Sequence, residues 1–334
     1  GRLSIHQRTV RLLSSRLLLE DLWRRHPEIE DIDLPAPIIV VGLPRSGTTH
    51  LVNLIAADSR LRSLPFWEST EPFPLPGEPD DARIERAQQA YELQISMAPL
   101  LPAMHHQHPD AVEEEIELED LDFASYTLEW LARVPRWRDY YFTLDQHHHY
   151  AYLRRVLQAL TFRRGPRRWV LKSPQHLEQL GPLVATFPDA TFAVTHRDPV
   201  SVIASAMTML AYGDRMRRYA IEPDELSSYW VERVERLLRA CVRDHELLPA
   251  DRTIDVLFHE FMADDVAMVD QIYDRARLPM TATARRELDA FMGANPRGKH
   301  GRLEYDLRGH FGLDPGAVRD RFAFYFERFA VHPE

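Results

Sequence analysis

The sequence predicts an α/β fold, a P-loop-like central parallel sheet flanked by helices with a helical insertion. Short apolar runs rich in β-branched residues alternate with helical patterns, an order typical of parallel strands joined by helices. The first run, residues 35–41, leads into a glycine-bounded turn and a helix, which is the outline of a loop that holds a phosphate. The 334 residues show neither a repeat nor a linker-like segment, so one domain over residues 1–334 is expected.

The individual elements follow from the spacing of apolar residues. Residues 1–34 carry apolar side chains at helical spacing, which predicts an N-terminal helix ended near His26-Pro27. Residues 80–160 show helical patterns between two expected strands, so they predict the helical insertion. The remaining expected strands are residues 168–172, 190–195 and 253–258, and the helices between and after them include 48–57, 145–161, 224–248 and 264–276.

Composition narrows the function classes. The chain has 41 Lys and Arg against 51 Asp and Glu, a net charge of −10, which argues against a nucleic-acid partner. No apolar run reaches the ~18 residues needed to span a bilayer, so no transmembrane segment is expected. The single cysteine, Cys241, allows no internal disulfide, which fits a cytoplasmic location.

The turn GLPRSGTT keeps the glycine spacing of a nucleotide-binding loop but lacks its lysine. Gly42 and Gly47 let backbone N–H groups converge on an anion, and the helix that starts at Thr48 adds its positive end. Thr48 occupies the lysine position, and Thr49 supplies a second hydroxyl. The charge in this turn is instead Arg45, whose rigid guanidinium suits phosphate or sulfate oxygens. Taken alone, such a turn could also merely link strand and helix.

A second absence agrees with the first. Enzymes that hydrolyse nucleoside triphosphates need an aspartate at the end of a neighbouring strand to help hold Mg²⁺. The strand at residues 190–195 is followed by His196 and Arg197, and arginine repels a metal but attracts a phosphate. The sequence therefore describes a nucleotide with two separate anionic groups and no obligatory magnesium, such as a 3′,5′-phosphorylated adenosine.

With these residues considered together, the loop resembles the 5′-phosphosulfate loop of sulfotransferases that use 3′-phosphoadenosine 5′-phosphosulfate (PAPS). It is most similar to the bacterial, arginine-loop branch and to the tyrosylprotein type. Three further stretches match in order across roughly residues 35–315: WVLKSPQHL at 169–177, THRDPVSVIASA at 195–206 and NPRGKHGRLEYDLRGHFGL at 295–313. The resemblance implies a PAPS-dependent sulfotransferase that releases adenosine 3′,5′-bisphosphate.

The resemblance also implies where the cofactor binds. Three groups of residues are expected to hold it: Arg45, Ser46, Gly47, Thr48 and Thr49 at the 5′-phosphate, Arg197 and Ser205 at the 3′-phosphate, and Arg297, Gly298 and Lys299 near the 3′ side. One departure is visible at FHEFMADD, residues 258–265, where the family commonly has a tyrosine in the place of Phe258. A hydroxyl contact to the adenosine would be lost there, whereas an aromatic surface would remain.

For the chemistry, the resemblance implies in-line displacement of the 5′-phosphate by an acceptor hydroxyl or amine. Arg45 and Lys172 are the expected catalytic cations, because fixed positive charge at the leaving oxygen lowers the barrier. Glu68, 23 residues after Arg45, is the expected base that takes the acceptor's proton. His176 and His196 remain rival bases.

Two histidine clusters invite a metal interpretation that the spacing does not support. His147, His148 and His149 are adjacent on an expected helix, so their side chains point to different faces. The second cluster, His105, His106 and His108, has no cysteine or carboxylate to complete a four-ligand set. No metal site is expected.

Three functions are compatible with the loop: the sulfotransferase, a P-loop kinase-like NTP enzyme, and a non-catalytic nucleotide sensor. The missing loop lysine and strand-end aspartate count against the kinase-like enzyme, and the joint presence of Arg45, Glu68 and Lys172 counts against the sensor. The acceptor stays open among a small molecule, a lipid and a glycan, with residues 66–145 expected to wall its pocket. O- versus N-sulfation and the oligomeric state are open as well.

Overall fold

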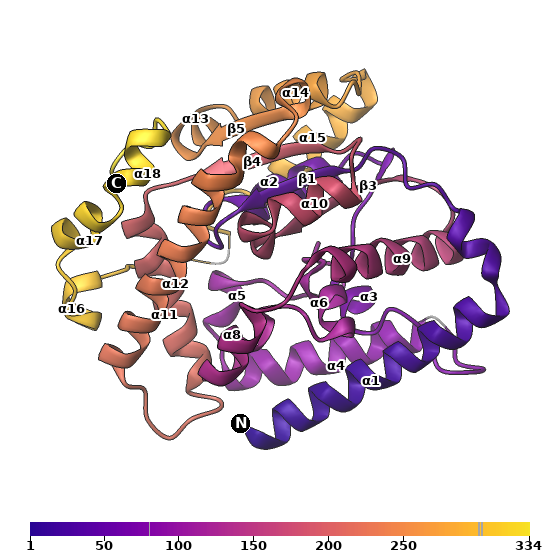
Figure 1. The fold of residues 1–334 in the computed structure, drawn as a ribbon, viewed down its shortest axis with the longest axis horizontal. Coiled ribbons are helices and arrows are strands. Elements are labelled where there is room, and N and C mark those ends of the chain that lie inside the picture. Colours follow the sequence, from indigo (N-terminus) through magenta and orange to yellow (C-terminus); the bar gives the residue numbers. More distant parts are fainter. Residues whose placement is uncertain (80, 300, 302) are drawn as a thin grey trace.

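The computed structural model describes residues 1–79, 81–299, 301 and 303–334 (Figure 1). Its centre is a five-stranded, all-parallel sheet in the order β2-β3-β1-β4-β5. The strands are β1 (Ile38–Gly42), β2 (Leu61–Arg62), β3 (Arg168–Ser173), β4 (Thr191–His196) and β5 (Thr253–Leu257). The predicted α/β fold with a central parallel sheet flanked by helices is confirmed.

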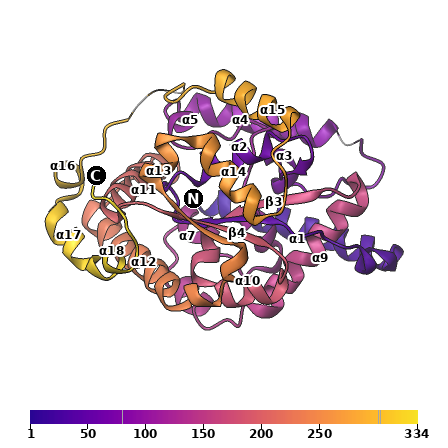
Figure 2. The same ribbon diagram turned by 90° about the horizontal axis from the view of Figure 1, so that it is seen from above.

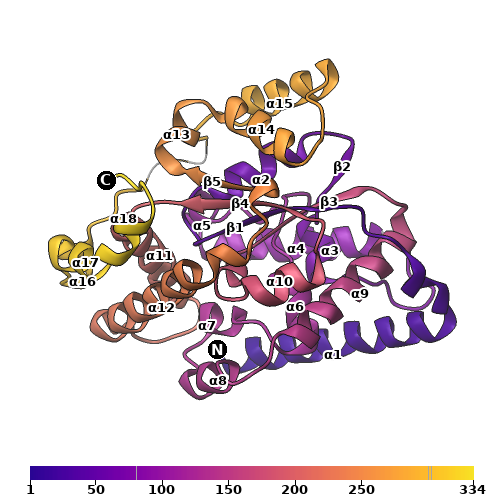
Figure 3. The same ribbon diagram turned by 45° about the horizontal axis from the view of Figure 1, so that its top comes forward.

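Alternate side chains of β1 enter two separate cores, so helices cover both faces of the sheet. Ile38 and Val40 pack in a core with α2 (Thr48–Ala56), α14 (Asp265–Arg275) and α15 (Ala282–Ala294). Ile39 and Val41 pack on the opposite face with α9 (His147–Arg164), α10 (Leu180–Thr186) and α12 (Pro223–Asp244). Figure 3 shows these two helical layers on either side of the strands. All five β1 residues are buried, as expected for a central parallel strand.

The register brings the carboxyl ends of three strands to one edge. Val40 of β1 lies opposite Lys172 of β3, and Gly42 lies opposite Thr195 of β4. Ligands of open α/β sheets bind outside such carboxyl ends. The turn after β1, Lys172 and the turn after β4 are therefore neighbours even though the chain separates them widely.

The chain between β2 and β3 is mainly helical, as the sequence predicted for residues 80–160. It forms α3 (Phe66–Thr70), α4 (Asp81–Met97), α5 (Leu101–Met104), α6 (Ile116–Glu119), α7 (Thr127–Leu131), α8 (Pro135–Tyr141) and α9. The N-terminal helix α1 (Arg2–Arg25) packs along α9, where the Trp23 and Tyr152 rings meet edge to face at 5.5 Å. This assembly lies on the same side of the sheet as α10 (Figure 1).

The rest of the chain closes the other parts of the sheet. After β4 come α11 (Pro199–Asp214) and α12, and after β5 come α13 (Phe258–Ala263), α14 and α15. Three short helices end the chain: α16 (Leu307–Phe311), α17 (Pro315–Arg321) and α18 (Ala323–Arg328). Seen from above, α14 lies over the β5 side of the sheet and the C-terminal helices lie beside α11 and α12 (Figure 2).

The edge strand β2 is an element that the sequence did not predict. It has only two residues, paired with Arg168 and Trp169 of β3, and so short a run carries no alternation that could be recognised. The predicted strand at residues 35–41 begins later than expected, at Ile38, because Pro35 and Pro37 cannot donate to a strand ladder.

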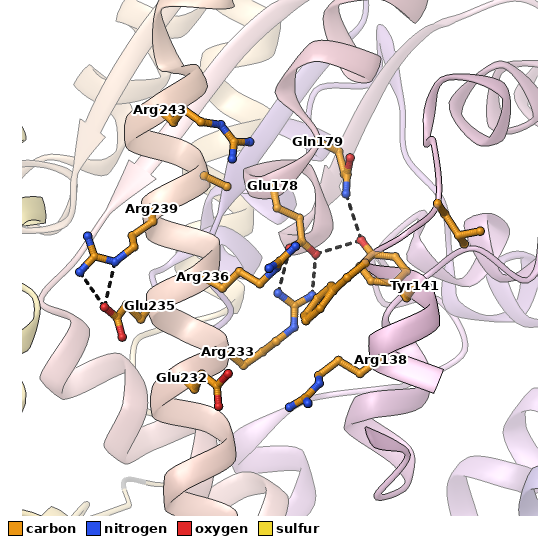
Figure 4. Close-up of a pocket in the computed structure, with 13 residues that line it drawn as sticks. Arg138, Tyr141, Glu178, Gln179, Glu232, Arg233, Glu235, Arg236, Arg239 and Arg243 are labelled. Carbon is orange, nitrogen blue, oxygen red and sulfur yellow. Dashed lines mark hydrogen bonds and ion pairs between the residues drawn. The ribbon is translucent and has the colours of Figure 1, made fainter. Parts of the chain in front are cut away.

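A buried charged cluster anchors α12 to the insertion (Figure 4). Arg233 donates to Glu178 at 2.5 Å and to Glu129 at 3.2 Å, and all three side chains are almost fully buried. The Tyr141 hydroxyl donates to Glu178 Oε1 at 2.9 Å. Because each charge has a partner, the cluster fixes α8 and α12 relative to one another.

Replacing Tyr141 with phenylalanine should therefore lower the free energy of unfolding by about 1.5–3 kcal/mol, the usual contribution of a hydrogen bond to a charged group. The ring would keep its packing, so the variant loses only the bond to Glu178 and the longer one that the hydroxyl accepts from Gln179 Nε2 at 3.4 Å. Urea unfolding followed by circular dichroism measures the change. Tyr140→Phe is the matched control, since Tyr140 is exposed. Equal stability of the two variants would contradict the role given to this hydrogen bond.

Candidate active site

The turn after β1 is shaped by two glycines that no other residue could replace without movement. A Cβ on Gly42 would lie 1.9 Å from Thr195 Oγ1. Gly47 has φ 89°, and a Cβ there would lie 3.2 Å from the Phe258 ring. Ser46 Oγ ties the turn together, because it donates to Leu43 O at 2.6 Å and lies 2.7 Å from Thr195 Oγ1.

The turn ends in the first residues of α2, which offers an anion site. Gly47 is the N-cap of α2, Thr48 is its first residue, and Thr48 and Thr49 both line a cavity. The first backbone N–H groups of a helix have no partner within it, and the positive end of its dipole points the same way. Helix α2 is apolar and buried beneath these residues, so its position is fixed by the core.

Arg45 and Arg197 meet at this turn. Arg45 Nε donates to Ser205 Oγ of α11 at 2.8 Å, and Arg197 Nη1 donates to the Arg45 carbonyl at 2.7 Å. The first contact also explains the position of Ser205, two turns into α11 on the face toward the loop. The structure therefore brings together the loop, Arg197 and Ser205, which the sequence placed in one site.

The Arg197 guanidinium already holds an anion. Its Nε and Nη2 donate to the two carboxylate oxygens of Glu334 at 2.8 and 2.7 Å. Its Cζ lies 4.0 Å above the centre of the Phe258 ring. In such a bidentate contact, two parallel N–H groups of arginine bind two oxygens, and arginine binds both carboxylate and phosphate in this way. The Glu334 carboxylate thus occupies a position on Arg197 that a phosphate could also occupy.

Lys172 reaches the same edge of the sheet from β3 and is almost completely buried, with 1% of its side chain exposed. Its ammonium donates to Glu114, and its backbone N–H donates to Glu115 Oε2 at 2.6 Å. Glu114 lies on the segment before α6, which runs past the end of β3. The lysine is therefore a fixed cation between the sheet and the insertion.

A cavity of about 190 Å³ opens next to the loop. Its polar wall contains Arg45, Thr48 and Thr49 together with His105, Glu113, Glu114 and others, and its apolar wall includes Leu101, Ile116, Trp130 and Met209. Two ion pairs involve residues that line this cavity. Glu114 pairs with Lys172, and Glu113 pairs with His105, with 3.4 Å between Glu113 Oε2 and His105 Nε2.

Burial and neighbouring charges shift the pKa values of Glu114 and His105. Burial raises the pKa of Glu114 above its usual value and the Glu113 carboxylate adds to this, although the Lys172 ammonium offsets part of the rise. Burial by itself would lower the pKa of His105, but the Glu113 carboxylate raises it overall. Shifted pKa values of groups that line a cavity are typical of sites where protons move.

Sequence reasoning missed these groups. Residues 113–119 form an acidic run at helical spacing, and such a pattern usually indicates a solvated helix face. In the structure, Glu113 N donates to Leu64 O at 2.8 Å, which holds the segment against the sheet before α6 begins. The only signal in the sequence is the concentration of three adjacent carboxylates, Glu113 to Glu115, before an apolar run.

Among the described residues that line this cavity are neither the expected base Glu68 nor its rivals His176 and His196. Glu68 is buried between Arg164 at 3.0 Å and Arg62 at 3.3 Å, and Arg62 lies over Trp169 at the start of β3, whereas Lys172 is near its end. In the described part of the chain, the charged partners of Glu68 are thus Arg62 and Arg164 rather than Arg45 and Lys172.

Both histidines are also engaged elsewhere. His176 is bound between Glu115 and Tyr150, at 2.8 Å from each. His196 is bound between Tyr325 at 2.7 Å and Asp255 at 2.9 Å. Each imidazole therefore has both nitrogens occupied by neighbours within the fold, which fits a structural role.

The segment expected near the cofactor's 3′ side does return to the loop region. Arg297 donates to Met262 O at 2.9 Å and to Asp265, whose carboxylate lies 2.8 Å from His50 Nε2 on α2. Farther along, the Tyr305 hydroxyl accepts a hydrogen bond from Arg45 at 3.3 Å.

The two neighbours of Arg297 in this segment are placed as follows. Lys299 Nζ donates to Asn295 Oδ1 at 3.0 Å, and Gly298 takes a left-handed conformation with φ 80°.

Comparison with known proteins decides the class. The sulfotransferase family model matches residues 37–282, most of the chain. The chain belongs to the sulfotransferase family. The family and enzyme class expected from the sequence are confirmed, and the protein transfers a sulfuryl group. A comparison with curated protein sequences finds no significant match.

Solved structures of bacterial sulfotransferases share the whole fold with this sulfotransferase. Sulfotransferase STF9 from Mycobacterium avium is 25% identical, with a TM-score of 0.82 over 97% of this chain and 84% of its own. Sulfotransferase STF1 from Mycobacterium tuberculosis H37Rv is 27% identical, with a TM-score of 0.79 over 94% of this chain and 83% of its own. These findings favour the sulfotransferase over the kinase-like and sensor alternatives.

The sulfotransferase also has a larger cavity, of about 380 Å³, on the flank of α12 (Figure 4). Its wall contains Arg138, Arg233, Arg236, Arg239 and Arg243 among other residues, and the loop residues 42–49 do not contribute to it. The smaller cavity is therefore the better candidate for the reaction, because only it joins the loop to groups with shifted pKa values. No described helix is long and apolar enough to cross a bilayer.

Proposed function

We propose that this sulfotransferase takes its sulfuryl group from PAPS and transfers it to a small acceptor in the cavity beside the loop. The proposal is supported mainly by two adjacent groups that can each bind an anion: the turn at Arg45 and the guanidinium of Arg197. A hydrogen bond from Arg197 to the Arg45 carbonyl joins them. PAPS carries anionic groups at both its 5′ and 3′ positions, so it can fill both anion-binding positions, whereas a ligand with a single phosphate would fill only one.

The 5′-phosphosulfate belongs at the start of α2. Backbone N–H groups of Ser46 to Thr49 and the hydroxyls of Thr48 and Thr49 supply donors there, and Arg45 supplies charge. The 3′-phosphate belongs at Arg197, where it would replace the Glu334 carboxylate. Ser205 holds Arg45 in place and can donate its own hydroxyl proton to the ligand. Arg297, Gly298 and Lys299 would close over the 3′ side.

In the transfer step, the acceptor oxygen or nitrogen forms a bond to sulfur while the bond from sulfur to the 5′-phosphate oxygen breaks. Negative charge grows on that leaving oxygen, and the cations of Lys172 and Arg45 are placed to stabilise it. The acceptor also loses a proton. We assign this proton to Glu114, which lines the cavity, contacts Lys172 and has a raised pKa that suits a general base.

The cavity wall suits a small alcohol, phenol or amine with an apolar body. Leu101, Ile116, Trp130 and Met209 offer apolar surface, and the reactive group would face Glu114. Pockets for drug-sized ligands usually measure ~300–1,000 Å³, and this cavity of about 190 Å³ is smaller, so it favours a small acceptor over a whole lipid or a long glycan.

Two measurements test the proposed function. Calorimetry in the presence of a chelator should show adenosine 3′,5′-bisphosphate binding with the same affinity as with magnesium, whereas ATP with magnesium binds weakly. Mass spectrometry of the protein with PAPS and a library of small alcohols, phenols and amines should then show products heavier by one sulfuryl group. Tight binding of ATP–Mg²⁺ without binding of the bisphosphate would contradict the choice of donor.

The Glu334 contact gives a separate prediction about cofactor affinity. Glu334 competes with the 3′-phosphate for Arg197, so Glu334→Gln should bind adenosine 3′,5′-bisphosphate up to about fivefold more tightly, as expected for a partly exposed ion pair worth about 1 kcal/mol or less. Calorimetry measures the affinity, and Glu327→Gln, an exposed change on α18, is the control. Weaker binding by Glu334→Gln would show that Glu334 helps to hold the cofactor instead.

A further inference from the structure

Behind the Arg197 turn, three potential metal ligands from three separate elements converge. They are His196 at the end of β4, Asp255 on β5, and His245 in the short 3₁₀ helix His245–Leu247 that follows α12. We propose that these three side chains form a binding site for a divalent transition-metal ion such as Zn²⁺, with water in the remaining coordination position.

The spacing of the ligand atoms is close to what such an ion requires. His196 Nε2 and His245 Nε2 lie 2.9 and 2.8 Å from the same oxygen of Asp255, and all three atoms lie within 4.8 Å of one another. Zinc bonds of ~2.0–2.1 Å at tetrahedral angles place ligand atoms roughly 3.3 Å apart. A shift of about half an ångström by Asp255, whose side chain is 39% exposed on an edge strand, would open the space for an ion.

His196 is already oriented as a ligand. Its side chain is fully buried and stacks on the Phe329 ring at 4.0 Å, so it has little freedom to turn. On the far side of the ring, Nδ1 lies 2.7 Å from the buried Tyr325 hydroxyl. If Nδ1 donates its proton to Tyr325, the lone pair of Nε2 faces Asp255. Metal-binding histidines characteristically have such a partner at the other nitrogen.

The other groups that face the three ligands favour an alternative to metal binding, a hydrogen-bonded network. Arg328 Nη2 lies 3.4 Å from His245 Nδ1 and pairs with Glu246 at 2.7 Å. A guanidinium can only donate, so this contact favours a proton on His245 Nε2 and a simple hydrogen-bonded network without metal. Arg328 is partly exposed and has its own carboxylate partner, so it can move away when a cation binds.

The chemistry of the set selects the ion. Two imidazoles and one carboxylate with an exposed fourth side suit Zn²⁺, Co²⁺ or Ni²⁺ rather than Mg²⁺ or Ca²⁺, which prefer oxygen ligands. The ion would stabilise the junction of β4, β5 and the end of α12. It would act on stability and on the Arg197 turn next in sequence, and the sulfuryl transfer itself does not need it.

The sequence predicts no metal site, because its two histidine clusters have unsuitable spacing or an incomplete ligand set. His196, His245 and Asp255 become neighbours only through the pairing of β4 with β5, in which Val194 lies opposite Asp255. The two histidine clusters that the sequence did suggest, around residues 105–108 and 147–149, provide an internal comparison for incidental binding.

The test uses the full-length protein after removal of metals with a chelator and dialysis. Titration with Co²⁺ should give visible d–d absorption that saturates at one equivalent, and one equivalent of Zn²⁺ should abolish it. Zn²⁺ should also raise the melting temperature. Asp255→Asn keeps the size of the side chain but removes its charge, so it should weaken Co²⁺ binding at least tenfold. His245→Gln should do the same without touching the buried His196.

A triple variant, His147→Ala with His148→Ala and His149→Ala, is the control for incidental surface binding and should keep the full signal. Circular dichroism verifies that each variant is folded. Failure of the wild-type protein to bind one equivalent of Co²⁺, or full binding by a folded Asp255→Asn variant, would overturn the proposal and leave a hydrogen-bonded network only. Loss of the signal in the triple variant would place the ion on α9 and overturn it as well.

Discussion

Replacing Lys172 with methionine should lower kcat by about 10²–10³-fold, the usual loss when one fixed donor to a developing negative charge is removed. Lys172 is buried at the end of β3, beside the loop that would hold the 5′-phosphosulfate, so its ammonium acts in a site from which water is largely excluded. Methionine fills the same space without the charge. Steady-state kinetics with PAPS and an acceptor measures the change.

Binding separates this effect from a loss of cofactor. Calorimetry with adenosine 3′,5′-bisphosphate should show nearly the same affinity for Lys172→Met as for the wild-type protein. Lys299→Met is the matched control, because Lys299 is exposed and lies in the segment expected at the 3′ side. It should weaken binding and leave kcat almost unchanged. A Lys172→Met variant with normal kcat would remove this lysine from the mechanism.

The second large effect is expected at Glu114. Glu114→Gln should lower kcat/KM by about 10²–10⁴-fold, the range for loss of a positioned general base. A base acts in its deprotonated form, so wild-type kcat/KM should rise with pH through the pKa of Glu114, which burial raises above the usual carboxyl value. Below that pKa the carboxyl is protonated and activity is lost. The glutamine variant should lose this acidic limb of the profile.

Glu68→Gln provides the contrast, because Glu68 is the base that the family resemblance implies. Its carboxylate lies between Arg62 and Arg164, so the variant should lose stability and keep most of its kcat and its acidic limb. If instead Glu68→Gln loses the acidic limb while Glu114→Gln retains it, the base is Glu68 and the cavity assignment fails. Midpoints of urea unfolding distinguish an inactive fold from an inactive site.

Much of the fold could be predicted because its local patterns are strong. The runs IIVV in β1 and FAV in β4 are continuous and apolar, as buried parallel strands require. Helix α12 has a clear apolar stripe and was expected within a few residues of its ends. The edge strand β2 was missed because two residues carry no period.

The donor side of the site was predictable for a similar reason, whereas the acceptor side was not. Gly42, Gly47 and Arg45 lie within one turn, and Arg197 with Ser205 lie within one strand-to-helix junction, so spacing along the chain reflects spacing in the molecule. Glu114 and His105 depend on how the insertion folds back onto β3. Nothing local in the sequence determines that contact.

The edge where β1, β3 and β4 end side by side has a consequence for how this enzyme folds. Its loop, Lys172 and Arg197 are far apart along the polypeptide, yet they become adjacent through the pairing of Val40 with Lys172 and of Gly42 with Thr195. Contacts so distant in sequence are slow to form, because a long stretch of chain must first be closed into a loop. During refolding, the circular-dichroism signal of the helices should return early, and enzymatic activity should return only when the three strands have paired.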